Sequence, residues 1–455
     1  MTVSRRTFLQ SASSAAAAAV LPGLLRAAPA GKRPPNIVMI ISDDHGWTDY
    51  GFMGHPTVKT PRLDKLATES LVFRRGYVPS PLCCPSLASM ITGLYPHQHK
   101  VTCNDPPGSD APRGKGPKAG TPEAKKAAEE RKKAFAEGRE VMSRHIESVD
   151  TLPRLLGKLG YASLQTGKWW QGHFSRGGFT HGMTQGQRHG DQGLDIGRKT
   201  MKPILDFIDQ AQKDDKPFFV WYAPMMPHDP HTPPADLLAK YQAKTDSIHQ
   251  ARYWAMVDWF DQTCGAILDH LDKTKLAEDT IVLYVADNGW TQDPNSRGPV
   301  RSKLTPYDAG LRTPIMVRWP GKVAPKMSDE LAMSIDLAPT ILSAVGQNPS
   351  AAMPGVNLLD EKAVAARKRV CGESYVHTAF DLHNPSKNLV TRWIVEGKWK
   401  LIVPTALAMD RGPVAPKQPE LYDIVADPKE TQDLAAEKPE VVKDLTAKLD
   451  AWWKP

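Results

Sequence analysis

The sequence predicts an α/β protein with a doubly wound, mostly parallel sheet, followed by a small C-terminal α+β subdomain. Continuous apolar runs such as Ile37–Ile41 are typical of strands that are buried on both faces of a parallel sheet. Helical patterns alternate with these runs over most of the chain. Polar clusters follow directly on the strands, at the carboxyl ends where α/β sheets bind their ligands.

The chain has 455 residues, and its sequence predicts three parts. Residues 1–30 have the pattern of a twin-arginine signal peptide: Arg5-Arg6 precedes an alanine-rich apolar segment, and Ala28-Pro29-Ala30 supplies small residues for cleavage. This pattern predicts export by the twin-arginine translocase, to the periplasm or the medium. Residues 31–365 are predicted to form the α/β domain, and residues 366–455 the α+β subdomain. No other segment predicts a membrane span.

The first elements are a strand, a helix and a second strand. The apolar run within residues 35–47 predicts a strand that ends at Asp43-Asp44, and residues 60–73 predict a helix leading into a strand. The segment that follows, "CCPSLASMITG", begins at Cys83 and ends at Gly93. Its adjacent cysteines indicate either a buried structural element or a reactive site.

Residues 104–148 are predicted to form a basic insertion. Pro, Gly and Lys predict a loop over residues 104–122, and the charged stretch from Pro122 to about Ile146 predicts a helical surface hairpin. The net charge of the chain is +8, and between Arg113 and Arg144 ten Lys and Arg residues stand against five Glu. This surplus suits a solvated surface or one that attracts polyanions. No nucleic-acid-binding motif accompanies it, so a nucleic acid partner is not predicted.

The later elements continue the alternation. The predicted elements are a helix and a strand that ends at Lys168 (151–170), a glycine-rich loop (171–198), a helix (203–212), a strand and a proline-stiffened loop with His228 (217–234), a long amphipathic helix (253–273), a strand that ends at Asp287-Asn288 (280–290) and a further strand (309–321). In the subdomain, residues 391–403 predict a hairpin around Gly397, residues 420–435 a strand and a turn, and residues 439–453 a terminal helix.

The cysteine count limits the disulfides. Five cysteines are too few for a disulfide framework in a chain of this length, and an odd number leaves at least one unpaired within the chain. A bond between Cys84 and Cys103 depends on the distance between them.

Three carboxylates and one amide follow two of the predicted strands. These are Asp43 and Asp44 after the first strand, and Asp287 and Asn288 after a later one. Oxygen ligands of this kind suit Ca²⁺ or Mg²⁺ better than a soft metal. An Asp pair alone after a strand can also cap a helix or solvate a loop, and two such pairs at strand ends are more specific.

Lys168, His228 and Lys303 are the candidate anion-binding residues. Taken singly, such a lysine is usually solvated and such a histidine is usually structural. Together and near a divalent cation, they predict a pocket for a tetrahedral oxyanion. Cys83 is the candidate nucleophile, but a thiolate beside a hard cation is a chemical mismatch. An oxygen nucleophile fits better, so we expect that Cys83 is not used as a cysteine.

With these segments in this order, the chain resembles the formylglycine-dependent (type I) sulfatases of the alkaline-phosphatase superfamily. The resemblance covers essentially the whole predicted mature chain. It is carried by Asp43-Asp44, Cys83-Cys84-Pro85-Ser86 with Thr92-Gly93, Gly167-Lys168-Trp169, Pro227-His228, Asp287-Asn288-Gly289, the segment 302–321 around Lys303, and the tail 420–435.

The resemblance implies a mechanism. A maturase would oxidise Cys83 to formylglycine, whose hydrate provides one hydroxyl that attacks sulfur and a second that allows sulfate to be released. Lys168, His228 and Lys303 would hold the sulfate oxygens and the leaving group. The resemblance also implies a metal site for Ca²⁺, with Mg²⁺ as the alternative, formed by the residue at position 83 with Asp43, Asp44, Asp287 and Asn288. The expected substrate is a sulfated small molecule or polysaccharide.

Two positions depart from the family pattern. Leu87 stands where the signature has an arginine, and Trp170 stands where the family has a histidine that takes a proton, which an indole cannot do. His173 is a hypothetical substitute, and Asp308 for Glu is a mild change. Three hypotheses remain: an exported sulfatase acting on a sulfated carbohydrate, a catalytically impaired protein that binds sulfated glycans, and a phosphate-ester hydrolase of the same superfamily.

Overall fold

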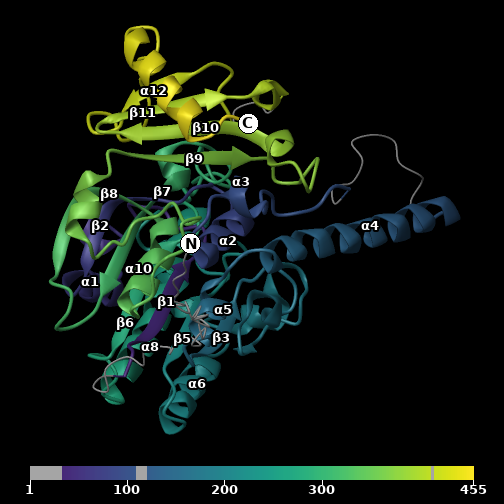
Figure 1. Ribbon diagram of the computed structural model, residues 1–455. Helices are drawn as coiled ribbons and strands as arrows, with labels where there is room; N and C mark the ends of the chain where they lie inside the picture. The colour runs from purple at the N-terminus through teal and green to yellow at the C-terminus, as the bar shows by residue number, and fades with distance from the viewer. Residues whose placement is uncertain (1–32, 109–119, 411–414) are drawn as a thin grey trace, which may run out of the picture. The chain divides into compact units, whose positions relative to one another are not determined.

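The computed structural model describes residues 33–108, 120–410 and 415–455. Residues 34–455 form one compact unit. It contains an eight-stranded sheet with helices on both faces and a second, four-stranded sheet (Figure 1). The whole predicted signal peptide and part of the predicted loop 104–122 lie outside the described residues.

The large sheet has the strand order β4-β3-β5-β1-β6-β7-β2-β8. Its strands are β1 (Asn36–Ser42), β2 (Leu71–Tyr77), β3 (Ala162–Gly167), β4 (His181–Gly182), β5 (Phe218–Ala223), β6 (Thr280–Ala286), β7 (Arg312–Arg318) and β8 (Lys326–Met333). β7 runs antiparallel to both of its neighbours, β6 and β2, and the other pairs are parallel. The prediction of a mostly parallel α/β sheet is therefore confirmed.

Helices cover both faces of this sheet because its central strands are apolar on both sides. In β1, Ile37, Met39 and Ile41 pack in one core cluster, and Val38 and Ile40 pack in another. The first cluster includes residues of α2 (Cys83–Thr92), α5 (Leu152–Gly157) and α10 (Leu337–Ala344). The second includes residues of α1 (Pro61–Thr68), α6 (Lys202–Lys213) and α8 (Ile248–Lys273). This is the doubly wound arrangement.

The basic insertion contains one helix, so the predicted hairpin is wrong. α4 (Pro122–Glu147) runs unbroken for 26 residues, and Thr121 caps its start by accepting a hydrogen bond from the amide of Ala124. Alanine, lysine and glutamate favour helix throughout this stretch, and no turn signal interrupts them. Its first four turns are largely exposed, and its buried residues all lie from Gly138 onward. Figure 1 shows α4 extending outward.

The second sheet is antiparallel, with the order β12-β11-β10-β9. Its strands are β9 (Arg369–Tyr375), β10 (Leu389–Glu396), β11 (Trp399–Pro404) and β12 (Glu420–Asp423). Gly397, at φ 60°, makes the predicted hairpin turn between β10 and β11. α12 (Pro439–Trp452) packs Leu445 and Leu449 against Ile394 and Leu401.

The remaining helices are short. They are α3 (Pro96–His99), α7 (Ala235–Gln242), α9 (Asp308–Leu311) and α11 (Glu361–Ala366), with the 3₁₀ turns η1 (Gly51–Met53), η2 (Phe174–Gly177), η3 (Arg188–Asp195), η4 (Ser334–Asp336), η5 (Pro385–Asn388) and η6 (Ala406–Asp410). Among the described residues, no helix combines the length and the apolar character that a membrane crossing needs. All five cysteines are buried and no disulfide joins any two of them, so Cys84 and Cys103 are not bonded to each other.

Candidate active site

The two acidic pairs meet at the carboxyl edge of the large sheet. β1 and β6 are parallel neighbours, and Ser42 lies in register with Ala286. The residues that follow are therefore side by side, and the amide of Asp287 donates to the carbonyl of Ser42 at 2.8 Å. Asp44, at φ 57°, turns back so that its amide reaches Oδ1 of Asp287 at 3.3 Å. The strand register thus gathers the predicted oxygen ligands.

Lys168 follows β3, and its side chain points to the first acidic pair. Its amide donates to the carbonyl of Ala223 at the end of β5. Its Nζ lies 2.7 Å from Oδ2 of Asp43 and 3.9 Å from Oδ2 of Asp287. The Lys168 side chain is fully buried, so this positive charge is enclosed with the carboxylates that it neutralises.

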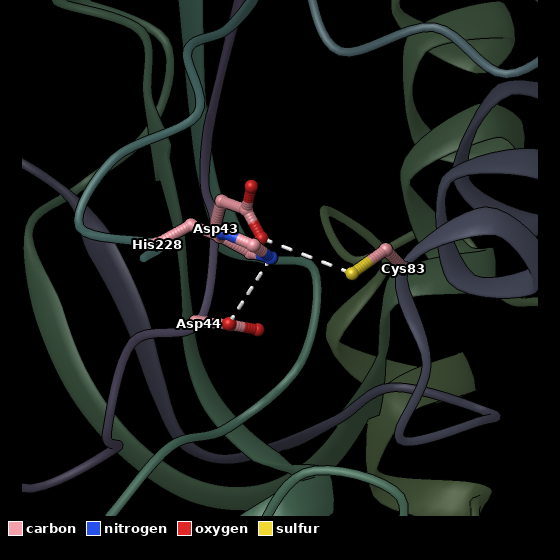
Figure 2. Close-up of side chains that lie close together, drawn as sticks. All are labelled: Asp43, Asp44, Cys83 and His228. Carbon is pink, nitrogen blue, oxygen red and sulfur yellow. Dashed lines mark hydrogen bonds and ion pairs between the residues drawn. The ribbon is translucent and has the colours of Figure 1, made fainter. Parts of the chain in front are cut away.

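Asp44 is the second centre of contacts. Lys303, from the loop before α9, places Nζ 2.7 Å from its Oδ1 and 2.8 Å from its Oδ2. Asn288 donates to the same carboxylate at 2.7 Å. His228, from the loop after β5, brings Nε2 to 3.4 Å from Oδ2 (Figure 2). Two of the three predicted anion-binding residues therefore converge on one carboxylate.

Cys83 is the first residue of α2, and its side chain points from that helix toward the acidic residues (Figure 2). Its Sγ lies 3.3 Å from Oδ1 of Asn288 and 3.9 Å from Oδ1 of Asp43. Burial raises the pKa of the thiol well above its usual value, so the side chain keeps its proton in this state. Cys84 points elsewhere and accepts a hydrogen bond from Gln171 at 3.2 Å.

The electrostatics of the site combine crowded carboxylates with buried cations. Burial, together with Asp43 and Asp44, raises the pKa of Asp287. Burial also raises the pKa of Asp44, but His228 and the two lysines outweigh it and hold that pKa below its usual value. Burial lowers the pKa of Lys168, but the surrounding acidic groups reverse this effect and keep the ammonium charged.

These residues fit a hard divalent cation. Asp43, Asp44, Cys83 and His228 each offer one ligand atom, and these atoms lie within 4.8 Å of one another. Oδ2 of Asp287 is buried and, within the described residues, accepts no hydrogen bond. Such a carboxylate oxygen is costly unless a cation approaches it. The arrangement can hold a cation on one side and, with Lys168 and Lys303, a tetrahedral anion next to it.

The two unusual positions are both buried. Leu87 is 4% exposed and belongs to the apolar cluster around α2. The Trp170 ring has three cations near it: Lys168 Nζ at 5.8 Å, Arg139 Cζ at 5.3 Å and Arg188 Cζ at 5.2 Å from its centroid. An indole attracts cations to its face, so Trp170 holds these side chains together.

The structure does not support His173 as a substitute for the missing histidine. Its Nδ1 is paired with the hydroxyl of Ser175 at 2.8 Å, and it caps the turn η2. His189 is near the site, although the sequence did not predict it. Its ring centroid lies 4.3 Å from that of Trp170 and 6.4 Å from that of His228. Arg139, Arg188 and Asp105 were also missed. No local motif marks these residues, because long-range contacts bring their segments together.

Comparison with known proteins decides the family. Residues 35–347 match the model described as Sulfatase, and residues 302–454 match the one described as N-sulphoglucosamine sulphohydrolase, C-terminal. The chain belongs to the sulfatase family. Its fold is accordingly the alkaline-phosphatase-like α/β fold with a C-terminal antiparallel sheet, as the resemblance implied.

Relatives of this sulfatase-family chain include human arylsulfatase A, which is 29% identical over 377 residues covering 72% of this chain. The alignment spans 66% of the human protein, just under two thirds of its length. The N-acetylgalactosamine-6-O-sulfatase of Bacteroides thetaiotaomicron is 25% identical, over 92% of this chain and 93% of its own. Among solved structures, Ps i-CgsB in complex with k-i-k-neocarrahexaose superposes with a TM-score of 0.71 at 19% identity, covering 92% of this chain and 93% of that one.

Proposed function

We propose that this protein is an exported hydrolase of sulfate esters, and that its substrate is a sulfated carbohydrate. The observation that carries the proposal is the enclosure of Cys83. Acidic residues from two strands lie on one side of it, and the charges of Lys168 and Lys303 lie within the same buried site. Export rests on the arginine pair and cleavage pattern in residues 1–30.

Each residue of the site would have its own role in ester cleavage. Lys168 and Lys303 are the cations that would bind the sulfate oxygens and stabilise the charge that develops on them. His228 is the group that would donate a proton to the leaving oxygen, because its imidazole reaches the same site from the loop after β5. Asp43, Asp44, Asp287 and Asn288 would hold Ca²⁺ or Mg²⁺, which supplies Lewis-acid polarisation of the sulfate and nucleophile. Formylglycine at position 83 would supply the oxygen nucleophile.

A cavity beside His228 favours a carbohydrate as the rest of the substrate. It has a volume of about 340 Å³, and its lining begins directly after His228, at Asp229 and Pro230. Arg297 pairs there with Asp229 at 3.0 Å, so Arg252 supplies the positive charge of the lining and Leu238 supplies apolar surface. Nε2 of His231 is buried and has no hydrogen-bond partner among the described residues. A sugar carrying hydroxyl and acidic groups would satisfy these donors.

The names of the relatives point the same way. One relative is called an N-acetylgalactosamine-6-O-sulfatase, and one structural neighbour was solved with a neocarrahexaose.

Mass spectrometry of the peptide that contains Cys83 tests the nucleophile. The protein is produced in cells that mature other sulfatases, and we expect the mass of the aldehyde in place of the thiol. An unmodified cysteine in such cells would contradict the sulfatase mechanism.

Turnover of an aryl sulfate and an aryl phosphate separates the hypotheses. We expect the sulfate to be cleaved at the higher kcat/KM. Preference for the phosphate would support a phosphate-ester hydrolase. Binding of sulfated glycans without turnover of either ester would support the impaired, glycan-binding alternative.

The variant Arg252→Ala tests whether a carbohydrate substrate extends into this cavity. We expect KM for a sulfated oligosaccharide to rise about tenfold, since one charge-assisted contact is lost. The same variant should leave KM for a small aryl sulfate unchanged, because that substrate does not extend to Arg252. Equal effects on both substrates, or no effect on either, would contradict a saccharide subsite in this cavity.

A further inference from the structure

The segment 184–193 is packed onto the carboxyl end of β3, directly beside Lys168. The amide of Trp169 donates to the carbonyl of His189 at 3.1 Å. A side chain at Gly190 would place its Cβ 2.5 Å from the carbonyl oxygen of Gly167, and one at Gly193 would place it 2.6 Å from the same atom. Only glycine allows so close an approach. The two glycines therefore fix this segment against the strand that carries Lys168.

The carboxylate of Asp191 fixes the conformation of the segment. It accepts hydrogen bonds from the backbone amides of Gln185 at 2.9 Å, Gln187 at 3.0 Å and Gln192 at 2.6 Å. Burial raises the pKa of Asp191, but these bonds outweigh that effect and lower it. His189 itself has φ 69°, a left-handed conformation that is unfavourable for a residue other than glycine. Such strain persists where surrounding contacts hold the residue in place.

Arg188 anchors the segment on its other side. Its Nε and Nη2 each donate to the carboxylate of Asp105 at 2.8 Å, a two-point ion pair that fixes the plane of the guanidinium. The same guanidinium lies over the Trp170 ring. Arg188 and Trp170 thus hold the backbone and the ring of His189 from two directions.

The His189 ring contacts the Trp170 ring edge to face, with centroids 4.3 Å apart, and its centroid lies 6.4 Å from that of His228. Burial and the positive charges of Lys168, Arg188, His228 and Lys303 lower its pKa to about 2. The ring is therefore neutral in this state, and it can donate one hydrogen bond and accept another. Trp170 has only an N–H donor, and that donor is buried without a partner among the described residues.

We propose that His189 is a substrate-binding residue of this site, where its imidazole donates a hydrogen bond to the bound sulfate group, and that Arg188 is its positioning residue. The inference rests on the proposed function and deepens it. It also explains how the chain can tolerate Trp170: the indole packs the segment that supplies an imidazole from elsewhere in the sequence.

The test measures inorganic sulfate binding by calorimetry and the turnover of 4-nitrophenyl sulfate, in His189→Ala and His189→Gln. We expect His189→Ala to weaken sulfate binding about tenfold and to lower kcat/KM by about the same factor, because one hydrogen bond to a charged group is lost. His189→Gln keeps a hydrogen-bond donor. We expect it to stay within about threefold of the unsubstituted protein in both measurements.

His173→Ala is the matched control, because that histidine lies in the same glycine-rich loop and outside the site. It should change neither measurement. Arg188→Ala should lower kcat/KM for the same ester, and Arg188→Lys should restore part of the loss if the residue acts by holding the segment. Equal losses in the alanine and lysine variants would contradict a positioning role.

Two outcomes overturn the proposal for His189. One is unchanged sulfate binding together with unchanged kcat/KM in His189→Ala. The other is an equal loss in His189→Ala and His189→Gln, which would show that a hydrogen-bond donor at this position does not bind the sulfate. If the unsubstituted protein cleaves no sulfate ester, the proposed function fails, and the calorimetry alone tests the role of His189. Weaker sulfate binding in His189→Ala would then support the role of His189 in binding sulfate. Unchanged binding would contradict that role.

Discussion

Leu87 occupies an apolar environment that has no place for a charge. It is 4% exposed, it lies on α2 four residues after Cys83, and every residue of that helix is buried. A guanidinium needs several hydrogen-bond acceptors or a carboxylate when it leaves water. The structure therefore indicates that the site is arranged to accommodate a leucine at position 87. Its positive charges come from Lys168, Lys303 and the segment of Arg188.

Introducing the family's arginine should consequently harm this protein. We expect Leu87→Arg to lower the free energy of unfolding by about 2 kcal/mol or more, because a charge is buried without a partner. Chemical denaturation measures the change. Leu87→Met, which keeps volume and polarity, should cost less than about 1.5 kcal/mol. Unchanged stability with increased turnover in Leu87→Arg would show that leucine is a defect and that the arginine finds a partner.

At the scale of elements, α8 supports the helix that precedes β2. Asp261 of α8 accepts hydrogen bonds from the amides of Arg62 at 3.0 Å and Leu63 at 2.7 Å, both in the first turn of α1. A carboxylate at a helix N-terminus satisfies free amides and complements the helix dipole. Burial outweighs these bonds and raises the pKa of Asp261 to about 7.

This raised pKa predicts a pH dependence of stability. Between about pH 4 and pH 7 the folded protein retains a proton on Asp261 that the unfolded chain has lost, so the contribution of this group to stability falls as pH rises. Asp261→Asn removes that dependence while keeping an acceptor for α1. We expect its stability relative to the unsubstituted protein to improve by about 1 kcal/mol or more from pH 5 to pH 8.

Denaturation at the two pH values measures the difference. Asp269→Asn is the control, because Asp269 is an exposed residue of the same helix in a surface ion pair with Arg62, and such pairs contribute little. A difference that stays constant with pH, or that moves in the opposite direction, would contradict the assignment to Asp261.

At the scale of the whole molecule, the acidic site joins segments that are far apart in the sequence. Asp43 and Asp287 follow different strands, and Cys83 brings α2 to the same point. Mutual repulsion of carboxylates opposes this assembly in the absence of a cation. A cation that binds the folded state alone stabilises it by mass action.

We therefore expect Ca²⁺ to raise the thermal unfolding midpoint and a chelator to lower it. A 100-fold excess over Kd corresponds to about 2.7 kcal/mol, which is a shift of a few degrees for a chain of this size. Asp287→Asn should reduce the shift, and Asp329→Asn, an exposed acid paired with Arg74, should not. A midpoint that does not respond to Ca²⁺ or Mg²⁺ would contradict a cation site here.

The sequence by itself determined the alternation of strands and helices and the positions of the acidic pairs, Lys168 and His228. These are local properties: a buried parallel strand needs an apolar run, and the residues after it lie at the binding edge. Lys303 and Cys83 do not follow a predicted strand, so their residue types and the resemblance to a family marked them as candidates. The structure brings all of them together, and their chemical roles stay predictions.

Only the tertiary structure decided how the protein accommodates Leu87 and Trp170, the two residues that depart from the family pattern. His173 is nearest to Trp170 in sequence, yet it pairs with Ser175, while His189 reaches the site from nineteen residues away. Contacts of its segment with Gly167 and Asp105 set that placement, and such contacts leave no period or motif in the sequence. The burial of Leu87 was decided in the same way, because packing against distant segments selects among the conformations that a local pattern allows.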